Sequence, residues 1–207
     1  MYLKRNKAIF GLFAILFGWI TFVTAYAGPG GDPVSVLRYA ADNMIKGLKA
    51  NQATLKSKPS IVYKLAYKYV VPNADLPEMS KRVVPPHIWN SATPAQREQF
   101  QKEFTRTLIR TYASSLTAYK DQTVQFFPVR GGGGGNTVEV ASEIDSSENS
   151  PISVTYRMIR VGGSWKLIDL SVEGVDMLES FRAQFADILS SGSMDQLLQR
   201  MKAHNNR

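Results

Sequence analysis

The sequence predicts an α+β fold in which a curved antiparallel sheet of about four strands packs against N-terminal and C-terminal helices. Two observations lead to this prediction. Apolar residues recur at helical spacing before residue 121 and after residue 176, whereas between these positions they alternate with polar residues. Helical and extended segments therefore do not alternate along the chain, which argues against a parallel sheet and for helices gathered on one face of an antiparallel sheet.

The N-terminal part of the domain predicts three helices. Asp32 followed by a proline is a typical helix start, and the apolar pattern after it predicts a helix to about Leu55. Residues 61–71 have high β propensity, but their apolar side chains recur every four residues and favour a second helix. A short third helix is expected over residues 78–84, where two consecutive prolines end it.

The clearest single element is a long helix that begins after Thr93. Thr93 and Gln96 form the pattern of a capping box, with a proline at the first helical position. The stripe of large apolar residues that follows consists of Phe100, Phe104, Leu108, Tyr112, Leu116 and Tyr119. This stripe predicts one continuous aromatic face on the helix, and we expect that face to lie toward the strands.

The apolar period changes to two after this helix, which predicts an antiparallel meander. The predicted strands cover residues 123–127, 137–144, 152–158 and 165–172. Gly162 and Gly163 indicate the hairpin between the last two strands. The glycine run at residues 131–135 predicts a flexible loop, because the Lys-Ser/Thr pair of a phosphate-binding loop does not follow it.

The last part of the chain predicts two more helices. Apolar residues from Met177 to Leu189 recur at helical spacing, and a Ser-Gly pair then ends the pattern. Ser193 and Gln196 form a second capping box, which opens the final helix. The polar residues 202–207 predict a frayed tail.

The N-terminus has the three parts of a secretory signal. Three basic residues lie among the first seven, an uncharged run covers residues 8–24, and Ala25 and Ala27 are small residues where a signal peptidase reads them. We expect residues 1–27 to be a cleaved signal peptide and residues 28–207 to be a single exported domain. The alternative is a membrane anchor, but an anchor needs about 20 apolar residues, and this run is shorter.

Charge and cysteine content exclude several classes of function. Removal of the signal leaves 22 basic and 17 acidic residues, a net charge of about +5. The basic residues are scattered, so solubility explains the charge as well as contact with anionic lipid or an acidic partner does. No nucleic-acid partner is expected. The chain has no Cys, which excludes cysteine nucleophiles, Fe–S clusters and thiolate zinc sites.

The titratable residues form no recognisable catalytic or metal-binding pattern. His87 follows two prolines in an expected loop and His204 lies in the tail, so too few ligands are present for a typical zinc site. An acidic group falls at a predicted strand-to-helix junction, where helix caps explain it. This group consists of Asp169, Glu173, Asp176 and Glu179. We therefore predict no enzyme activity, no metal and no cofactor.

Several segments carry a family resemblance. They are residues 91–98 with the aromatic stripe after them, Tyr156-Arg157, residues 165–169 and residues 172–175. Together they resemble the MlaC family of periplasmic phospholipid-binding proteins, also called the toluene-tolerance (Ttg) family, over about residues 32–201. The glycine run at residues 131–135 departs from the family pattern.

The resemblance implies a curved sheet closed by helices, similar to the nuclear-transport-factor-like cone, with an apolar pocket for acyl chains between the long helix and the sheet. It also implies a soluble periplasmic carrier that shuttles phospholipid between an outer-membrane lipoprotein complex and an inner-membrane ABC transporter with its MCE subunit. The expected lipid-binding residues are Phe100, Phe104, Leu108, Tyr112, Leu116, Tyr119, Val154, Tyr156, Met158, Trp165, Leu167, Phe181 and Phe185.

Three alternatives stay open from the sequence. One is an exported binding protein for another apolar ligand, such as an isoprenoid. Another is an enzyme of the related fold with a buried acid in the cone, for which Asp169 is the candidate. The third is an adaptor whose core is filled and holds no ligand. Identification of a co-purified ligand, the direction of the Asp169 side chain and the presence of a cavity distinguish them.

Overall fold

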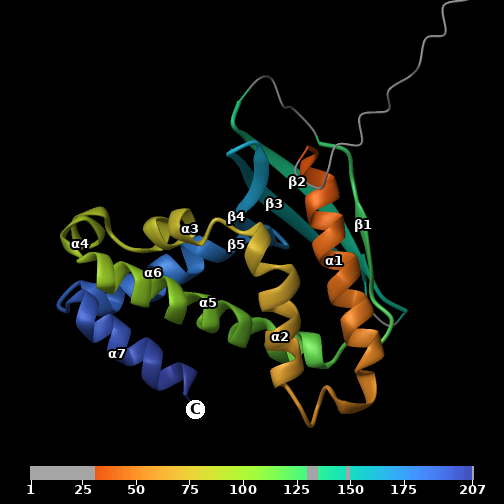
Figure 1. Ribbon diagram of the computed structural model, residues 1–207, viewed down its shortest axis with the longest axis horizontal. Helices are drawn as coiled ribbons and strands as arrows, with labels where there is room; N and C mark the ends of the chain where they lie inside the picture. Colours follow the sequence, from red (N-terminus) through yellow and green to blue (C-terminus); the bar gives the residue numbers. More distant parts are fainter. Residues whose placement is uncertain (1–30, 130–134, 148–149, 207) are drawn as a thin grey trace, which may run out of the picture.

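The protein is described by a computed structural model over residues 31–129, 135–147 and 150–206. The expected signal peptide at residues 1–27 lies outside these ranges. Within them, five antiparallel strands form one sheet in the order β1-β2-β3-β4-β5, and the helices lie across and beside it (Figure 1). The predicted α+β class is confirmed.

The elements follow one another in the predicted order. The α-helices in the described residues are α1 (Pro33–Ala50), α2 (Ser60–Tyr69), α3 (Leu76–Val83), α4 (Pro86–Ser91), α5 (Pro94–Thr117), α6 (Met177–Leu189) and α7 (Met194–Asn205). The strands are β1 (Thr123–Phe126), β2 (Thr137–Asp145), β3 (Ile152–Val161), β4 (Ser164–Val172) and β5 (Val175–Asp176). The four predicted strands correspond to β1–β4, and the two-residue β5 is an addition that the sequence does not predict.

Local capping signals place the helix starts correctly. At α5 the Gln96 amide donates to Thr93 Oγ1 (3.2 Å) and the Thr93 amide donates to Gln96 Oε1 (2.8 Å), which is the predicted capping box. Ser193 and Gln196 make the same pair of bonds at α7. Asp32 caps α1 by accepting from the Ser35 amide (2.9 Å).

One predicted helix end and one predicted loop are wrong. Helix α1 ends at Ala50 instead of about Leu55, and a short 3₁₀ turn, Gln52–Thr54, follows it. The proline pair ends α3 but also opens α4, because proline at the first helical position lacks only an N–H that has no helical partner there. His87 therefore lies in α4 and not in a loop.

The C-terminal tail is also more ordered than predicted. Helix α7 continues to Asn205, whose side chain is buried against α5. Its amide nitrogen donates to the Glu103 carbonyl oxygen (3.0 Å) and to Glu103 Oε2 (2.9 Å), and its amide oxygen accepts from Thr107 Oγ1 (3.1 Å). A polar sequence ends in a helix here because a specific buried partner satisfies its polar groups.

The sheet has an apolar inner face and a polar outer face. Strand β3 alternates between the two, with Tyr156 and Met158 inward and Thr155 and Arg157 outward. Helix α1 covers part of the inner face through Val36 and Leu37 and crosses the strands in Figure 1. The side-chain direction on β3 and β4 therefore decides which residues face the interior.

Strand β4 contains one extra residue relative to β3. Arg157 pairs with Asp169 and Met158 pairs with Leu167, so Ile168 has no partner on β3 and forms a bulge. On the edge of β4 that faces away from β3, the backbone has a different partner on each side of the bulge. Before it, the Asp75 amide donates to the Leu167 carbonyl oxygen (2.8 Å), and after it β5 pairs with β4.

Buried apolar side chains form three separate clusters. The helical cluster unites α3 to α7 and consists of Met79, Val83, Val84, Trp89, Ala92, Phe100, Phe104, Met177, Leu178, Phe181, Phe185, Leu189, Met194, Leu197 and Met201. The sheet cluster consists of Val36, Leu37, Phe126, Val138, Val140, Met158 and Trp165. The hairpin cluster, under α1 and α2, consists of Leu48, Leu55, Val62, Ala113 and Tyr119. Domains of this size more often have one contiguous core with small satellites.

Candidate functional site

Four of the predicted lipid-binding residues pack mainly on one another. Phe100 and Phe104 of α5 are stacked with ring centroids 5.6 Å apart, Phe104 lies edge-to-face on Phe181 of α6 at 5.4 Å, and Phe100 does so on Phe185 at 5.8 Å. All four are at most 5% exposed and belong to the helical cluster. The expectation that this end of the aromatic stripe faces the strands is wrong, because the C-terminal helices cover it.

The rest of the stripe does not continue that face. Leu108 is partly buried against the helical cluster, Tyr112 is 39% exposed, and Leu116 and Tyr119 belong to or pack on the hairpin cluster. A step of four residues exceeds one helical turn of about 3.6 residues. Successive members of the stripe therefore rotate around a helix of 24 residues. The stripe reaches two clusters in succession, and the prediction of one continuous face is wrong.

The predicted residues on the strands share the inner face of the sheet. Val154, Tyr156 and Met158 alternate along β3, and Trp165 and Leu167 lie opposite on β4. Tyr156 is partly buried, its ring lies 5.8 Å from that of Phe126, and its hydroxyl accepts from Ser142 Oγ (3.2 Å). Burial raises the pKa of Tyr156, which stays neutral under ordinary conditions.

The border between two clusters runs across this inner face. Tyr156 and Leu170 are cross-strand partners, yet Tyr156 packs against the sheet cluster and Leu170 against the helical cluster. Leu108 also packs against the helical cluster. Each of the three side chains is only partly buried. Tyr156 and Leu170 mark an apolar border between the sheet cluster and the helical cluster, which we call the cluster border. Leu108 is a partly buried residue on its helical side.

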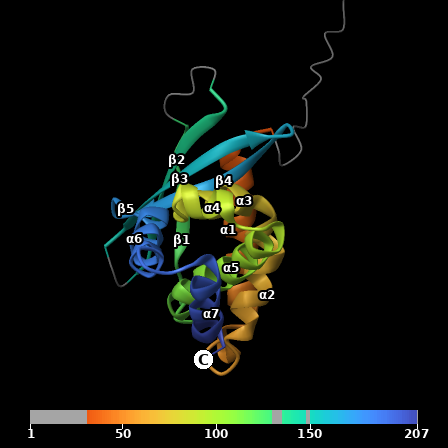
Figure 2. The same ribbon diagram turned by 90° about the vertical axis from the view of Figure 1, so that its left-hand side faces the viewer.

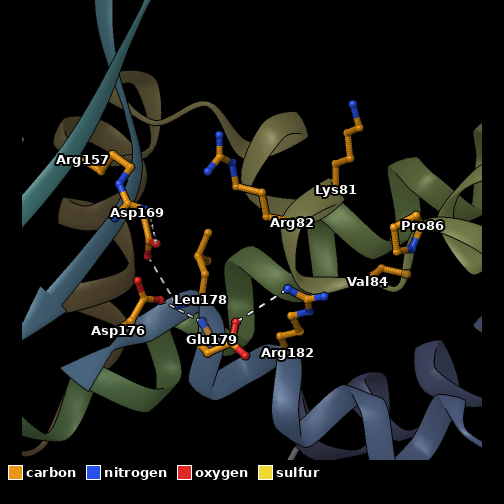
Figure 3. A pocket seen from close by; sticks show the side chains of 10 residues that line it. All are labelled: Lys81, Arg82, Val84, Pro86, Arg157, Asp169, Asp176, Leu178, Glu179 and Arg182. Carbon is orange, nitrogen blue, oxygen red and sulfur yellow. Dashed lines mark hydrogen bonds and ion pairs between the residues drawn. The ribbon is translucent and has the colours of Figure 1, made fainter. Parts of the chain in front are cut away.

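A polar pocket of about 350 Å³ lies elsewhere, between α3, α6 and the neighbouring strands (Figure 3). Its lining residues are Lys81, Arg82, Val84, Pro86, Arg157, Asp169, Asp176, Leu178, Glu179 and Arg182. All thirteen predicted lipid-binding residues are described by the structure, and none of them lines this pocket. No periodic pattern in the sequence predicts the pocket, because its residues come from six separate helices and strands.

Asp169 is the strongly perturbed acid of the polar pocket. The side chain is only 6% exposed. Its Oδ1 accepts from the Leu170 amide (2.8 Å) and the Leu178 amide (3.4 Å), and Arg157 Nη1 lies 3.7 Å from its Oδ2. Burial, then a hydrogen bond and charge repulsion from Asp176, raise the pKa of Asp169 from 3.8 to about 6. Asp176 caps α6 by accepting from the Glu179 amide (2.8 Å), which confirms that part of the acidic group serves as a helix cap.

The enzyme alternative needs an acid directed into the apolar interior. Asp169 pairs with Arg157, whose neighbours on β3 are the inward-facing Tyr156 and Met158. Because successive side chains alternate between faces, Asp169 shares the outer face with Arg157. Within the described residues, no group of three or more His, Cys, Asp or Glu side chains is arranged to hold a metal ion. The described helices also include none long and apolar enough to cross a membrane.

Comparison with known proteins identifies the family. A family model described as "MlaC protein" matches residues 38–203, which is most of the chain. The chain belongs to this family. The resemblance found in the capping-box segment, the aromatic stripe and the strand motifs is therefore confirmed.

Two relatives of the MlaC family align over most of their lengths. The toluene tolerance protein ttg2D of Pseudomonas putida is 28% identical over 163 residues, which cover 79% of this chain and 75% of the relative. The intermembrane phospholipid transport system binding protein MlaC of Haemophilus influenzae is 27% identical over 183 residues, which cover 87% of this chain and 85% of the relative.

A solved structure shares the fold of this MlaC-family chain. The phospholipid-binding protein from Ralstonia solanacearum, determined in complex with a phospholipid, superposes with a TM-score of 0.78 at 28% sequence identity. The match covers 84% of this chain and 97% of that one. Nearly all of the neighbour's fold is therefore present here.

Proposed function

We propose that this protein binds a phospholipid and carries it through the periplasm between an outer-membrane lipoprotein complex and an inner-membrane ABC transporter with an MCE subunit. The observation that carries the proposal is the match to nearly the whole of a protein solved with a phospholipid bound. Membership in the MlaC family and the name of the Haemophilus influenzae relative support the transport role. Export by cleavage after Ala27 is part of the proposal.

We place the acyl chains at the cluster border, with the inner face of the sheet on one side and Leu108 on the other. Apolar side chains on the two sides belong to different clusters, so the sheet and the helices can separate there without opening either cluster. The phenylalanines of the helical cluster then form a fixed wall behind the tails. Of the thirteen predicted residues, those on β3 and β4 together with Leu108 make the direct contacts.

The size of the apolar ligand explains why a carrier is needed. A diacyl lipid has on the order of 30 methylenes, each worth roughly 0.8 kcal/mol on removal from water, or roughly 24 kcal/mol before ordering costs. Dissociation into water is then very slow, since tight binding appears mainly as a small off-rate. Release needs contact with a partner that offers a continuous apolar path. The headgroup remains in water at the mouth, so headgroup selectivity is low.

The first test identifies the ligand and its place. Protein purified from the periplasm is analysed by native mass spectrometry, and the extracted ligand is identified. Leu108→Trp takes up space at the cluster border that the acyl chains would occupy, so it should lower lipid occupancy at least about threefold while the protein stays folded. In a filled core the same change would instead overpack the interior and destabilise the fold. Val161→Trp is the control, because it adds the same side chain at an apolar residue of β3 that is 45% exposed. If the extracted ligand is an isoprenoid, or if no ligand is found, the protein is not a phospholipid carrier. If folded Leu108→Trp keeps full lipid occupancy, the acyl chains do not lie at the cluster border.

The second test concerns contact-dependent release. Carrier loaded with labelled phospholipid is dialysed against acceptor liposomes across a membrane that blocks protein. Almost no label should cross, and purified inner-membrane partner added on the carrier side should remove label from the carrier. Rapid transfer across the barrier without partner shows that the ligand is held loosely and ends this part of the proposal. N-terminal sequencing of the periplasmic protein, expected to start at Gly28, tests export.

A further inference from the structure

The helices that carry the helical cluster join the sheet along one edge, that of β4. The Asp75 amide, just before α3, donates to the Leu167 carbonyl oxygen (2.8 Å), and Lys166 Nζ donates to the Pro72 carbonyl oxygen (2.6 Å). On the other side of the bulge, β5 pairs with β4 and leads directly into α6. Figures 1 and 2 both show α3 and α6 leaving the sheet beside β4 and β5. Any separation of sheet and helices at the cluster border therefore strains this junction.

Two carboxyl groups face each other at the junction (Figure 3). Asp169 of β4 accepts from the Leu178 amide in the first turn of α6, and Asp176 caps the same turn through the Glu179 amide. Both carboxyl groups line the polar pocket, and a hydrogen bond and charge repulsion from Asp176 are among the causes that raise the pKa of Asp169. Because an ionised carboxylate only accepts hydrogen bonds, a bond between these two groups requires a shared proton.

The surrounding charges do not compensate both carboxylates. Arg157 of β3 lies 3.7 Å from Asp169 but also 3.4 Å from Glu139 of β2, and its side chain is 41% exposed. The remaining charged residues that line the polar pocket come from α3 and α6, and two of them already have acidic partners: Arg82 pairs with Glu78 (2.9 Å) and Arg182 with Glu179 (3.7 Å). Lys81 completes the set. When both Asp169 and Asp176 are ionised, they repel each other across the β4–α6 contact.

We propose that Asp169 and Asp176 form a proton-operated latch, which holds α6 on β4 while the two carboxyl groups share a proton and loosens this junction when both are ionised. The latch acts on the lipid site because α6 carries part of the helical cluster and β4 carries the inner face of the sheet. Its consequence for lipid release rests on the proposed function. Lipid transfer should accordingly be faster at neutral than at acidic pH.

The direction of the effect follows from proton linkage. Asp169 has its pKa raised to about 6 in the folded protein, from an ordinary 3.8. The folded state therefore binds this proton more tightly than the unfolded state does, and the resulting stabilisation is complete below about pH 4 and is lost as pH rises through about 6. The junction is latched on the acidic side of this window and loosened on the neutral side.

The latch itself is tested without lipid. Carboxyl carbon chemical shifts of Asp169 are followed by NMR as a function of pH, together with hydrogen-exchange protection of the Leu178 and Glu179 amides. Asp169 should titrate near pH 6, and protection at both amides should fall as it ionises. Titration of Asp169 below about pH 4.5, close to the ordinary range for an aspartate, or protection that does not change with its ionisation, overturns the proposal.

Lipid transfer then tests regulation. Loaded carrier is mixed with vesicles of phosphatidylethanolamine and phosphatidylglycerol. Transfer should be about threefold to tenfold faster at about pH 7.5 than at about pH 5, because each pH unit changes the ratio of ionised to protonated Asp169 about tenfold. Asp169→Asn keeps the acceptor for the Leu178 amide and imitates the protonated acid, so it should transfer slowly at both pH values. Asp176→Ser keeps a helix cap, removes the repulsion, and should also lose the pH dependence.

The control separates the latch from an ordinary helix cap. Asp32 caps α1 through the Ser35 amide, so Asp32→Ser changes a cap of the same kind outside the β4–α6 junction. It should retain the wild-type ratio of rates. Equal pH dependence in wild type and Asp169→Asn overturns the regulatory role. If the protein binds no lipid, the proposed function falls, while the NMR and hydrogen-exchange results still decide whether the latch exists.

Discussion

The helical cluster and the sheet cluster are both rich in aromatic residues, but they are packed differently. In the helical cluster four phenylalanines lie edge-to-face or stacked on one another and are at most 5% exposed. In the sheet cluster the inner face ends in partly buried side chains such as Tyr156, Val124 and Val129. Aromatic content in the sequence therefore does not distinguish a fully buried cluster from a partly exposed face; the difference lies in how completely the rest of the protein covers the rings.

The largest expected effect tests whether the helical cluster is a filled core. Phe104→Ala should lower the free energy of unfolding by about 3–5 kcal/mol, because it removes a fully buried ring and leaves a cavity, as measured by urea denaturation. Lipid bound per folded molecule should stay near the wild-type value. Loss of lipid with little loss of stability makes Phe104 a ligand contact and erases the distinction between the two clusters.

The next effect concerns the clamp that closes the helical cluster at the C-terminus. Asn205→Ala removes two donors to Glu103 and leaves its buried carboxylate with Arg106 Nη1 at 3.7 Å as its remaining charged partner among the described residues. We expect a loss of about 2–3 kcal/mol, the cost of an unsatisfied buried polar group. Asn206→Ala, one residue later and exposed, is the control. If both variants lower the free energy of unfolding by the same small amount, the tail is frayed, as the sequence predicts.

The smallest effect probes the sheet side. Tyr156→Phe leaves the buried Ser142 hydroxyl without its tyrosine partner and should cost about 1 kcal/mol. Lipid occupancy should not fall, because the ring that faces the cluster border is retained. Tyr112→Phe should change stability by less than about 0.5 kcal/mol, as expected for an exposed side chain. A sharp fall in occupancy for Tyr156→Phe means that its hydroxyl, rather than the ring, contacts the ligand.

The accuracy of the sequence predictions depends on the range of the interactions involved. Capping boxes at Thr93 and Ser193 and the alternation in β3 are local patterns, and the structure contains each of them. Helix α4 is too short for an apolar period to reveal it, and the bulge at Ile168 has no signature in composition. The sequence therefore predicts the elements well, because their determinants lie within a few residues.

The site is harder to predict because it depends on which elements meet. Phe104 and Tyr112 occupy equivalent places in the stripe, yet one is fully buried by α6 and the other is 39% exposed. Nothing in the local pattern distinguishes them. The polar pocket combines side chains from α3, α4, β3, β4, β5 and α6, so only the tertiary fold brings Asp169 and Asp176 together.

The bulge in β4 also bears on how copies of this protein avoid one another. A nine-residue strand at the border of a sheet offers a row of unpaired backbone groups on which a second molecule can add a strand. Here the extra residue divides that row: Asp75 occupies the part around Leu167, and β5 occupies the part around Ser171 and Val172. On the opposite border, β1 is only four residues long. A protein proposed to open an apolar interior for its cargo thus offers little backbone template for self-association while that interior is accessible.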